Sequence, residues 1–148
     1  MPSTHLSLHY HLLFSTKGLS PLIAKDWRTD LHAYMAGIVK GIGAVPVAVG
    51  GVEDHAHLLI GLNATHRLDY VVRDIKANSS SWVHREIAQR QFEWQAGYLG
   101  LTVSPSQIER VRKYILRQEK IHQRKTFQEE YLELLKLSGI QYDQRYLW

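Results

Sequence analysis

The spacing of apolar residues changes between two periods along this chain, and the order of the changes restricts the fold more than any other feature. Apolar residues occupy every second position from Leu6 to Phe14, which is the period of a half-buried strand. They then recur at helical spacing from about Lys25 to Ile42. Further strands are predicted at 45–49, 55–62 and 98–103, and a second helix at 68–89. The predicted order is therefore strand, helix, strand, strand, helix, strand.

Split βαβ units in this order build an α+β fold of the ferredoxin-like type. Its four strands form one antiparallel sheet with helices on one face, and the first and third strands are neighbours at the centre. We expect C-terminal helices to follow this unit, and we expect the opposite face of the sheet to be open.

The C-terminal part begins with a strong helix-start signal. Ser104-Pro105-Ser106-Gln107 has a serine at the N-cap, proline at the first helical position and glutamine at the third, which predicts a capping box. A helix should follow over about 105–124, then a shorter helix and an aromatic tail over 126–148. Because domains of roughly 100–150 residues are the commonest size, we expect one domain over residues 1–148.

Composition excludes several classes of protein. A hydrophobic share of 45% with 22% charged residues is that of a globular chain. The chain has no cysteine, so a metal site would use histidine, carboxylate or amide ligands, and a cysteine nucleophile is excluded. The first 14 residues lack a signal-peptide pattern, and the longest apolar stretch, 37–52, is too short to span a membrane. We therefore expect a soluble, cytoplasmic protein.

Positive charge is concentrated in one segment of the chain. The formal net charge is only +4, but seven basic residues lie between Arg110 and Lys125 against one acid, Glu119. A solvated helix face usually alternates the sign of its charges, so this segment favours a polyanionic partner over the alternative of a merely solvated face.

A second polar cluster lies on the helix predicted at 68–89. Its side chains include Lys76, Asn78 and Arg85, with three serines between them. Such cationic, amide and hydroxyl donors suit phosphate oxygens. The alternative is a polar and slightly frayed helix segment.

Two pairs of histidines could bind a metal ion. His55 and His57 are two residues apart on a predicted strand, so both imidazoles point to the same face. The alternative is a pair of surface or hydrogen-bonded histidines. His9 and His11 have the same spacing on another strand, and periodicity alone does not choose between the pairs.

Tyr114 and Gln118 are candidates for catalysis. They are four residues apart, so they lie on one helix face, with His122 one turn further along. A phenol near a metal ion and surrounded by cations can attack a phosphate. The surrounding cations are Arg112, Lys113 and Arg117. The alternative is a tyrosine that packs at the margin of the core with its hydroxyl in water.

Taken together, these segments resemble the HUH-class single-tyrosine transposases of bacterial insertion sequences, the insertion-sequence two-hundred group. The resemblance covers almost the whole chain. It rests on His9-Tyr10-His11-Leu12, Gly51-Val52-Glu53-Asp54-His55-Ala56-His57-Leu58-Leu59, Asp74-Ile75-Lys76-Ala77-Asn78-Ser79-Ser80, Phe92-Glu93-Trp94-Gln95-Ala96-Gly97-Tyr98, Val103-Ser104-Pro105-Ser106-Gln107, Tyr114-Ile115-Leu116-Arg117-Gln118 and Phe127-Gln128-Glu129-Glu130-Tyr131. One departure is Leu99-Gly100-Leu101, where a small residue and an aromatic are expected after Gly97-Tyr98.

The resemblance assigns roles to individual residues. It implies that His55 and His57 bind a divalent ion, Mg²⁺ or Mn²⁺, that Gln118 completes the site, and that Tyr114 is the nucleophile. Three further residues are candidates for holding the metal ligands in position without binding the ion themselves: Glu53, His11 and His122. The candidates for contacting DNA are Lys76, Asn78, Arg85, Arg112, Lys113 and Arg117.

The resemblance also implies a reaction and its partners. A transposase of this kind nicks single-stranded DNA whose ends carry hairpins, forms a 5′-phosphotyrosine link and rejoins the strand. It works as a homodimer associated with the bacterial nucleoid during activity. Two alternatives remain at this level: a domesticated relative that processes chromosomal hairpin repeats, and a non-catalytic nucleic-acid-binding module. The absence of aromatic residues from 55–62 counts against an RNA-binding module, because such modules stack bases on central strands.

Overall fold

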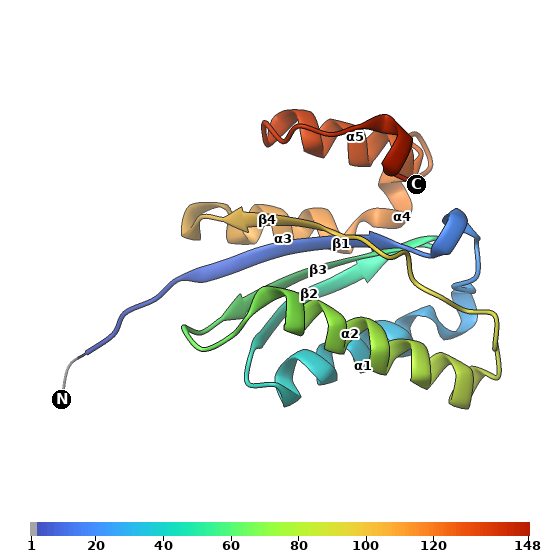
Figure 1. Ribbon diagram of the computed structural model, residues 1–148, viewed down its shortest axis with the longest axis horizontal. Coiled ribbons are helices and arrows are strands. Elements are labelled where there is room, and N and C mark those ends of the chain that lie inside the picture. The colour runs from blue at the N-terminus through green and yellow to red at the C-terminus, as the bar shows by residue number, and fades with distance from the viewer. Residues whose placement is uncertain (1–2) are drawn as a thin grey trace.

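The computed structural model describes residues 3–148 and places four strands in one antiparallel sheet (Figure 1). The strands are β1 (Leu8–Ser15), β2 (Val45–Gly51), β3 (His55–Leu62) and β4 (Leu99–Val103). Their order across the sheet is β2-β3-β1-β4, and every neighbouring pair is antiparallel. The first and third strands are therefore central, and the predicted ferredoxin-like α+β fold is confirmed.

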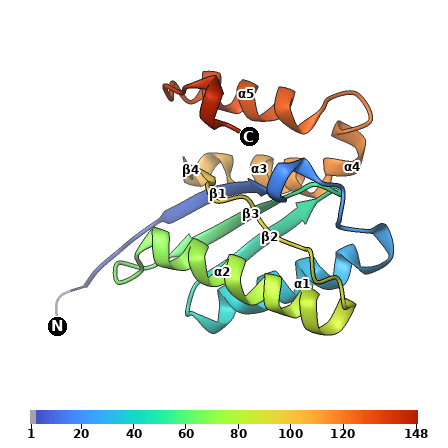
Figure 2. The ribbon, with the colours of Figure 1, turned by 45° about the vertical axis from the view of Figure 1, so that its right-hand side comes forward.

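Two helices, α1 (Lys25–Gly41) and α2 (Leu68–Trp82), cover one face of the sheet (Figure 2). Alternate strand residues such as Leu12 and Leu58 are fully buried against Leu31 of α1 and Ile75 of α2. The second helix, predicted over about 68–89, is present: α2 is followed directly by one π-helical turn at Val83–Ile87. Within the described residues, no helix combines the length and the apolar character needed to cross a bilayer.

The other face of the sheet is covered as well, so the prediction of an open face was wrong. Helices α3 (Ile108–Leu116), α4 (Gln118–Ile121) and α5 (Phe127–Leu137) lie on this side (Figure 1). The strands supply apolar side chains there too: Leu59 packs with Ile115, and Leu13 packs with Phe127. The sheet has two buried faces because its second face carries leucines next to the histidines, and these leucines need apolar cover.

The predicted unbroken helix over 105–124 was also wrong. A short 3-10 turn at Pro105–Gln107 leads into α3, and the helix breaks at Arg117, where φ is −107° and ψ is 22°. Ser104 makes no side-chain cap, so no capping box forms there. The capping box of this region is between Thr126 and Glu129 at the start of α5. The break redirects the chain, so that α5 returns over the sheet.

Close contact between β2 and α3 depends on Gly50. A Cβ atom at Gly50 would lie 2.3 Å from the carbonyl oxygen of Ile115, the residue after Tyr114. Backbone atoms cannot yield as a flexible side chain does. Any larger residue at position 50 must therefore displace the helix that carries Tyr114.

We expect Gly50→Ala to lower the free energy of unfolding by about 1–3 kcal/mol, the usual cost of overpacking. Gly37→Ala is the matched control, because a Cβ atom there meets nothing within 4 Å. Since alanine favours helix over glycine, the control should gain up to about 1 kcal/mol. Urea unfolding of both variants measures the difference, and equal stabilities would contradict the proposed close contact.

Candidate functional site

Four side chains converge between the sheet and the C-terminal helices. His55 and His57 come from β3, His122 directly follows α4, and Glu130 comes from α5. One ligand atom of each residue lies within 4.8 Å of the others. His55, His57 and Glu130 are at most 1% exposed. Both strand histidines point to the same face, as their spacing predicted, whereas Ala56 and Leu58 join the core on the other side.

Glu130 lies at the centre of this cluster, and its two carboxylate oxygens face different groups. Oε1 is 3.1 Å from the Nε2 atoms of both His57 and His122, and 3.4 Å from His55 Nε2. Oε2 accepts a hydrogen bond from the Tyr114 hydroxyl and another, at 3.2 Å, from Gln118 Nε2. Glu130 therefore joins the histidines to the tyrosine.

Sequence reasoning missed Glu130, although a signal for it was present. It lies between Phe127, Tyr131 and Leu135 on the apolar stripe of α5, the face that packs on the sheet. A carboxylate at a core position needs buried polar partners, because an unpaired charge is very costly there. This placement on the stripe predicts a polar cluster opposite α5.

Tyr114 and Gln118 reach the cluster from one helix face, as their spacing of four residues predicted. The Tyr114 ring centroid is 5.8 Å from that of His57, and Gln118 Oε1 is 3.1 Å from His55 Nε2. Burial and the nearby Glu130 carboxylate raise the pKa of Tyr114, so the hydroxyl is protonated at neutral pH. The structure thus brings Tyr114 to the histidines of its own chain.

A carboxylate on each side controls the charge of His55. Burial disfavours its imidazolium form, but the hydrogen bonds to Asp54 and Glu130 outweigh burial and raise the pKa of His55 to about 9. Asp54 Oδ1 is 2.7 Å from His55 Nδ1. Sequence reasoning gave a supporting role to Glu53, but this residue is exposed and its neighbour Asp54 makes the contact.

His11 supports the cluster from β1. Its Nε2 and His57 Nδ1 share a hydrogen bond of 2.8 Å, and the two rings stack with centroids 5.0 Å apart. Since one ring must donate and the other accept, this hydrogen bond needs at least one neutral ring. Burial, followed by the neighbouring His57, lowers the pKa of His11 to about 3. The rival pair does not converge on the cluster, because His9 lies further along β1 beside Ser7.

Acid is expected to destabilise the protein partly through His11. The unfolded chain protonates this residue near its ordinary pKa of 6.5, whereas the folded protein resists protonation to about pH 3. The stabilisation is therefore complete above pH 6.5 and is lost as the pH falls towards 3. Between pH 7 and about pH 5, the unfolding free energy of His11→Asn should decline less steeply than that of wild type. The control His5→Asn, at an exposed position, should follow wild type; parallel curves for all three proteins would contradict the prediction.

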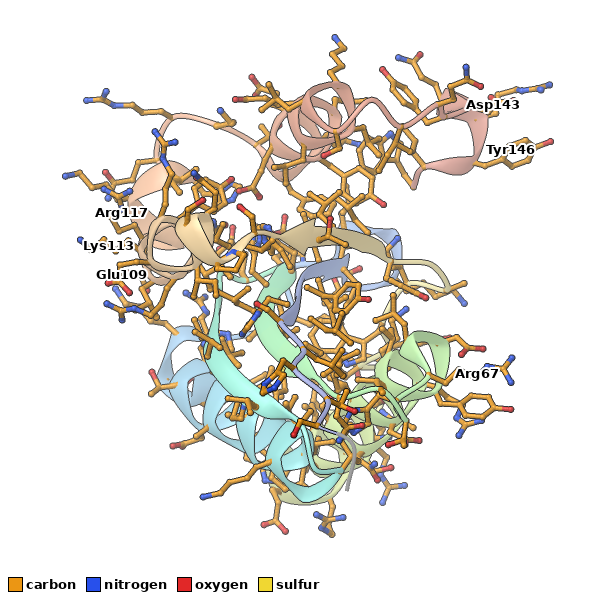
Figure 3. All side chains as sticks on the ribbon, turned by 90° about the vertical axis from the view of Figure 1, so that its left-hand side faces the viewer. Arg67, Glu109, Lys113, Arg117, Asp143 and Tyr146 are labelled. Carbon is orange, nitrogen blue, oxygen red and sulfur yellow. The ribbon has the colours of Figure 1, made fainter. Side chains whose placement is uncertain are left out.

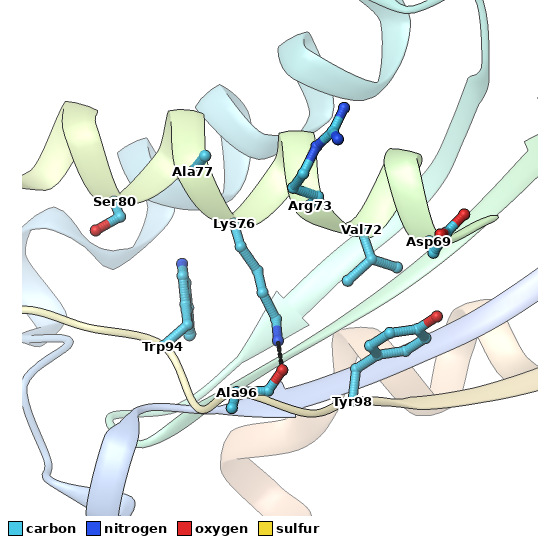
Figure 4. Close-up of a pocket in the computed structure, with 9 residues that line it drawn as sticks. All are labelled: Asp69, Val72, Arg73, Lys76, Ala77, Ser80, Trp94, Ala96 and Tyr98. Carbon is cyan, nitrogen blue, oxygen red and sulfur yellow. Dashed lines mark hydrogen bonds between the residues drawn. The ribbon is translucent and has the colours of Figure 1, made fainter. Parts of the chain in front are cut away.

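The DNA-contact candidates on α2 and on the π-helical turn after it lie on the other side of the sheet from the cluster. Lys76 lines a cavity beside Tyr98, and Figure 4 shows its Nζ donating to the Ala96 carbonyl. The same ammonium group also donates to the carbonyls of Gln95 and Gly97, at 2.8 and 2.6 Å. Asn78 donates to the Asp74 carbonyl, and Arg85 pairs with Glu86. The structure therefore does not bring these three residues to Tyr114.

The candidates on α3 lie closer to Tyr114 but differ in their contacts. Arg112 forms two hydrogen bonds with Glu109, at 2.9 and 2.6 Å, so its charge is locally paired. Lys113 and Arg117 project outward from the side of the molecule (Figure 3). Of these residues, Arg117 borders the groove beside Tyr114.

This groove, which we call the tyrosine groove, has a volume of about 570 Å³ and opens beside Tyr114 and Ile121. Four cations complete its lining, namely Arg117, Lys120, Arg124 and Lys125. Lys125 is paired with Glu133, which reduces the net charge. A strand of phosphodiesters suits this lining, because Lys and Arg neutralise backbone phosphates without reading the base sequence.

Comparison with known proteins identifies relatives of this arrangement. The family model described as Transposase IS200 like matches residues 4–118. No curated protein matches. A solved structure of a Deinococcus radiodurans R1 protein, assigned as a transposase, shares the fold with a TM-score of 0.64 at 23% identity, over 78% of this chain and 93% of that one. A REP-associated tyrosine transposase bound to a REP hairpin aligns with a TM-score of 0.56 at 10% identity, over 78% of this chain and 68% of that one.

Proposed function

The chain belongs to the family of IS200-like transposases, and on this basis we propose that it cleaves and rejoins single-stranded DNA with Tyr114 as the nucleophile. One observation carries the proposal: the Tyr114 hydroxyl lies against the histidine and carboxylate cluster, and its ring borders the cationic tyrosine groove. The nucleophile and the cations that would hold a DNA strand thus share one opening.

The proposed reaction is a transesterification. The Tyr114 oxygen forms a bond to the phosphorus atom while the bond from phosphorus to the 3′ oxygen breaks. The products are a 5′-phosphotyrosine link and a 3′-hydroxyl, so no water is consumed. In the reverse sense, another 3′-hydroxyl displaces Tyr114 and reseals the strand.

Glu130 is the proposed acceptor of the phenol proton. Because the pKa of Tyr114 is raised, the proton must leave as the new bond forms, and Glu130 Oε2 already accepts this hydrogen bond. The 3′ oxygen that leaves takes up a proton from the solvent, and Glu130 keeps the phenol proton until the reverse reaction returns it to Tyr114. Arg117 and Lys120 would hold the phosphates on either side of the reacting one.

The donor set fits a divalent ion. His55 and His57 offer buried imidazole nitrogens, and Glu130 Oε1 lies within reach of both. Gln118 Oε1 and His122 Nε2 lie beside them, 2.9 Å apart. We propose that His55, His57 and Glu130 hold Mg²⁺ or Mn²⁺, with Gln118 as a further oxygen donor. The ion, when bound, supplies a Lewis acid that neutralises charge on the phosphoryl oxygens.

The proposed substrate is single-stranded DNA that carries hairpin ends. A structural neighbour is described as bound to a REP hairpin, which supports this class of DNA. We also propose that the protein acts as a homodimer. Since Tyr114 lies against the histidines of its own chain, each subunit would contain a complete site.

A covalent-capture experiment tests the function. The protein is incubated with Mn²⁺ and labelled single-stranded DNA from the ends of its own genomic locus, and the products are separated on a denaturing gel. We expect a protein band that carries labelled DNA, and mass spectrometry should place the nucleotide on the peptide with Tyr114. Binding without any adduct, across several metals and end sequences, would instead indicate a non-catalytic DNA-binding protein.

A further inference from the structure

Another cavity lies between α1, the end of β2 and the break between α3 and α4. Its volume is about 380 Å³, and we call it the α1 cavity. Arg28, Thr29 and His32 line it from α1, and Gly50 lines it from β2. The reaction proposed above makes no use of the three α1 side chains that line this cavity.

The α1 cavity is positively charged. Three cations, Arg28, Arg117 and Lys120, line it against one acid, Glu119. The Arg28 side chain is only 11% exposed and donates to the Ile23 carbonyl at 2.9 Å, so its guanidinium is held in place. Its contact with Glu119 is 3.4 Å long, and the Glu119 side chain is 58% exposed. A partner this exposed is easily exchanged for a phosphate, because a solvated ion pair contributes little.

His32, which lines the cavity, also has a polar atom without a protein partner. His32 Nε2 is buried, yet it has no hydrogen-bond partner within residues 3–148. Burial, together with the positive charge of Arg28, lowers the pKa of His32 to about 4, so the ring is neutral at pH 7. Buried polar groups are nearly always hydrogen-bonded, and a neutral imidazole suits a base or a sugar hydroxyl.

The α1 cavity and the tyrosine groove adjoin at the start of α4. Arg117 and Lys120 line both of them. Gln118, between these two cations, lines the α1 cavity and contacts His55 with its side chain. A strand that lies in the tyrosine groove can therefore continue over Arg117 into the α1 cavity.

We propose that the α1 cavity binds one nucleotide of the DNA strand next to the reacting phosphodiester. Arg28 would bind its phosphate together with Arg117 and Lys120, and His32 would hydrogen-bond its base or sugar. This assignment rests on the proposed function, and it adds a DNA-binding site on α1 to the one proposed in the tyrosine groove.

The test measures binding separately from catalysis. Proteins that carry Tyr114→Phe are mixed, in EDTA, with a fluorescein-labelled oligothymidylate of about 15 nucleotides, and anisotropy gives Kd at several salt concentrations. Loss of one phosphate contact should reduce the slope of log Kd against log salt by about 0.7 for a single strand. We expect this reduction for Arg28→Gln. Arg145→Gln is the control, since Arg145 is also paired with an acid, at 2.7 Å to Asp143, but lies in the C-terminal tail.

A second pair of variants keeps the test independent of folding. Thr29 is exposed on α1, so a change of its side chain should not disturb the fold. Thr29→Glu should weaken binding about tenfold by repelling the phosphate, whereas Thr29→Gln, with the same shape, should bind as wild type does. His32→Phe should weaken binding several-fold without a change in the salt slope, because the contact that it removes is neutral.

The outcomes separate this proposal from the proposed function. Unchanged slopes for Arg28→Gln, together with equal affinities for the two Thr29 variants, would overturn the nucleotide site even if wild type forms the Tyr114 adduct. Unchanged binding by His32→Phe would overturn the role of His32. If the slopes change as expected but wild type forms no adduct, the nucleotide site is supported and the catalytic proposal fails.

Discussion

Replacing Tyr114 with phenylalanine is expected to abolish the covalent DNA adduct and all strand rejoining. The variant retains the ring that packs near His11 and His57 but lacks the oxygen that would attack phosphorus. Removal of a nucleophile commonly lowers the rate by about 10⁴-fold or more, so the adduct band should disappear from a denaturing gel. Binding of single-stranded DNA should persist, because the cations of the tyrosine groove are unchanged.

Tyr146→Phe is the matched control for this experiment. Tyr146 is 79% exposed in the C-terminal tail, so its hydroxyl should be dispensable and the adduct should form as in wild type. An adduct that persists in Tyr114→Phe and maps to another residue would refute the assignment of the nucleophile. Loss of DNA binding as well as of the adduct would point to a role in folding instead.

Replacing Glu130 with glutamine should remove the carboxylate that is proposed to bind the metal ion and to accept the Tyr114 proton. Glutamine keeps the shape but has no negative charge to bind a cation or accept the Tyr114 proton. Loss of residues that merely orient metal ligands costs about 10–100-fold in affinity, so we expect at least the upper end of this range for a direct ligand. Calorimetric titration with Mn²⁺ in the absence of DNA measures the affinity, and the gel assay should show little adduct.

Glu129→Gln, one residue away, is the control for Glu130→Gln. Glu129 is exposed, and glutamine can also take the third position of the capping box with Thr126, so this variant should bind Mn²⁺ like wild type. Gln118→Ala then compares the two oxygen donors. If it abolishes Mn²⁺ binding while Glu130→Gln does not, the amide and not the carboxylate completes the metal site.

Much of this arrangement follows from spacing within single segments. A strand turns alternate residues to one face, so the order His55-Ala56-His57 was enough to predict two imidazoles on the same side. A helix turns residues four apart to one face, which placed Tyr114 with Gln118. The alternation of strands and helices likewise predicted the central position of β1 and β3.

The predictions that were wrong concern contacts between segments far apart in the sequence. The sequence around 105–124 is compatible with an unbroken helix, yet the chain breaks at Arg117 and the buried Gln118 side chain contacts His55. Lys76 is a residue type that commonly contacts phosphate, and it lies in a polar segment. Its ammonium group is nevertheless bound to backbone carbonyls 19 and 21 residues further along the chain. Helix propensity and local composition do not reveal such partners, because they lie far away in the sequence.

The sequence by itself determined which side chains share a face, because the periods of strands and helices are local properties of the backbone. Only the tertiary structure decided which faces meet. His57 and Glu130 are 73 residues apart, and they touch because α5 returns over the second apolar face of the sheet. The central carboxylate arises from this packing, and the α1 cavity arises from the packing of α3 and α4 beside α1 and β2. In both cases the distance between elements depends on how their surfaces fit together.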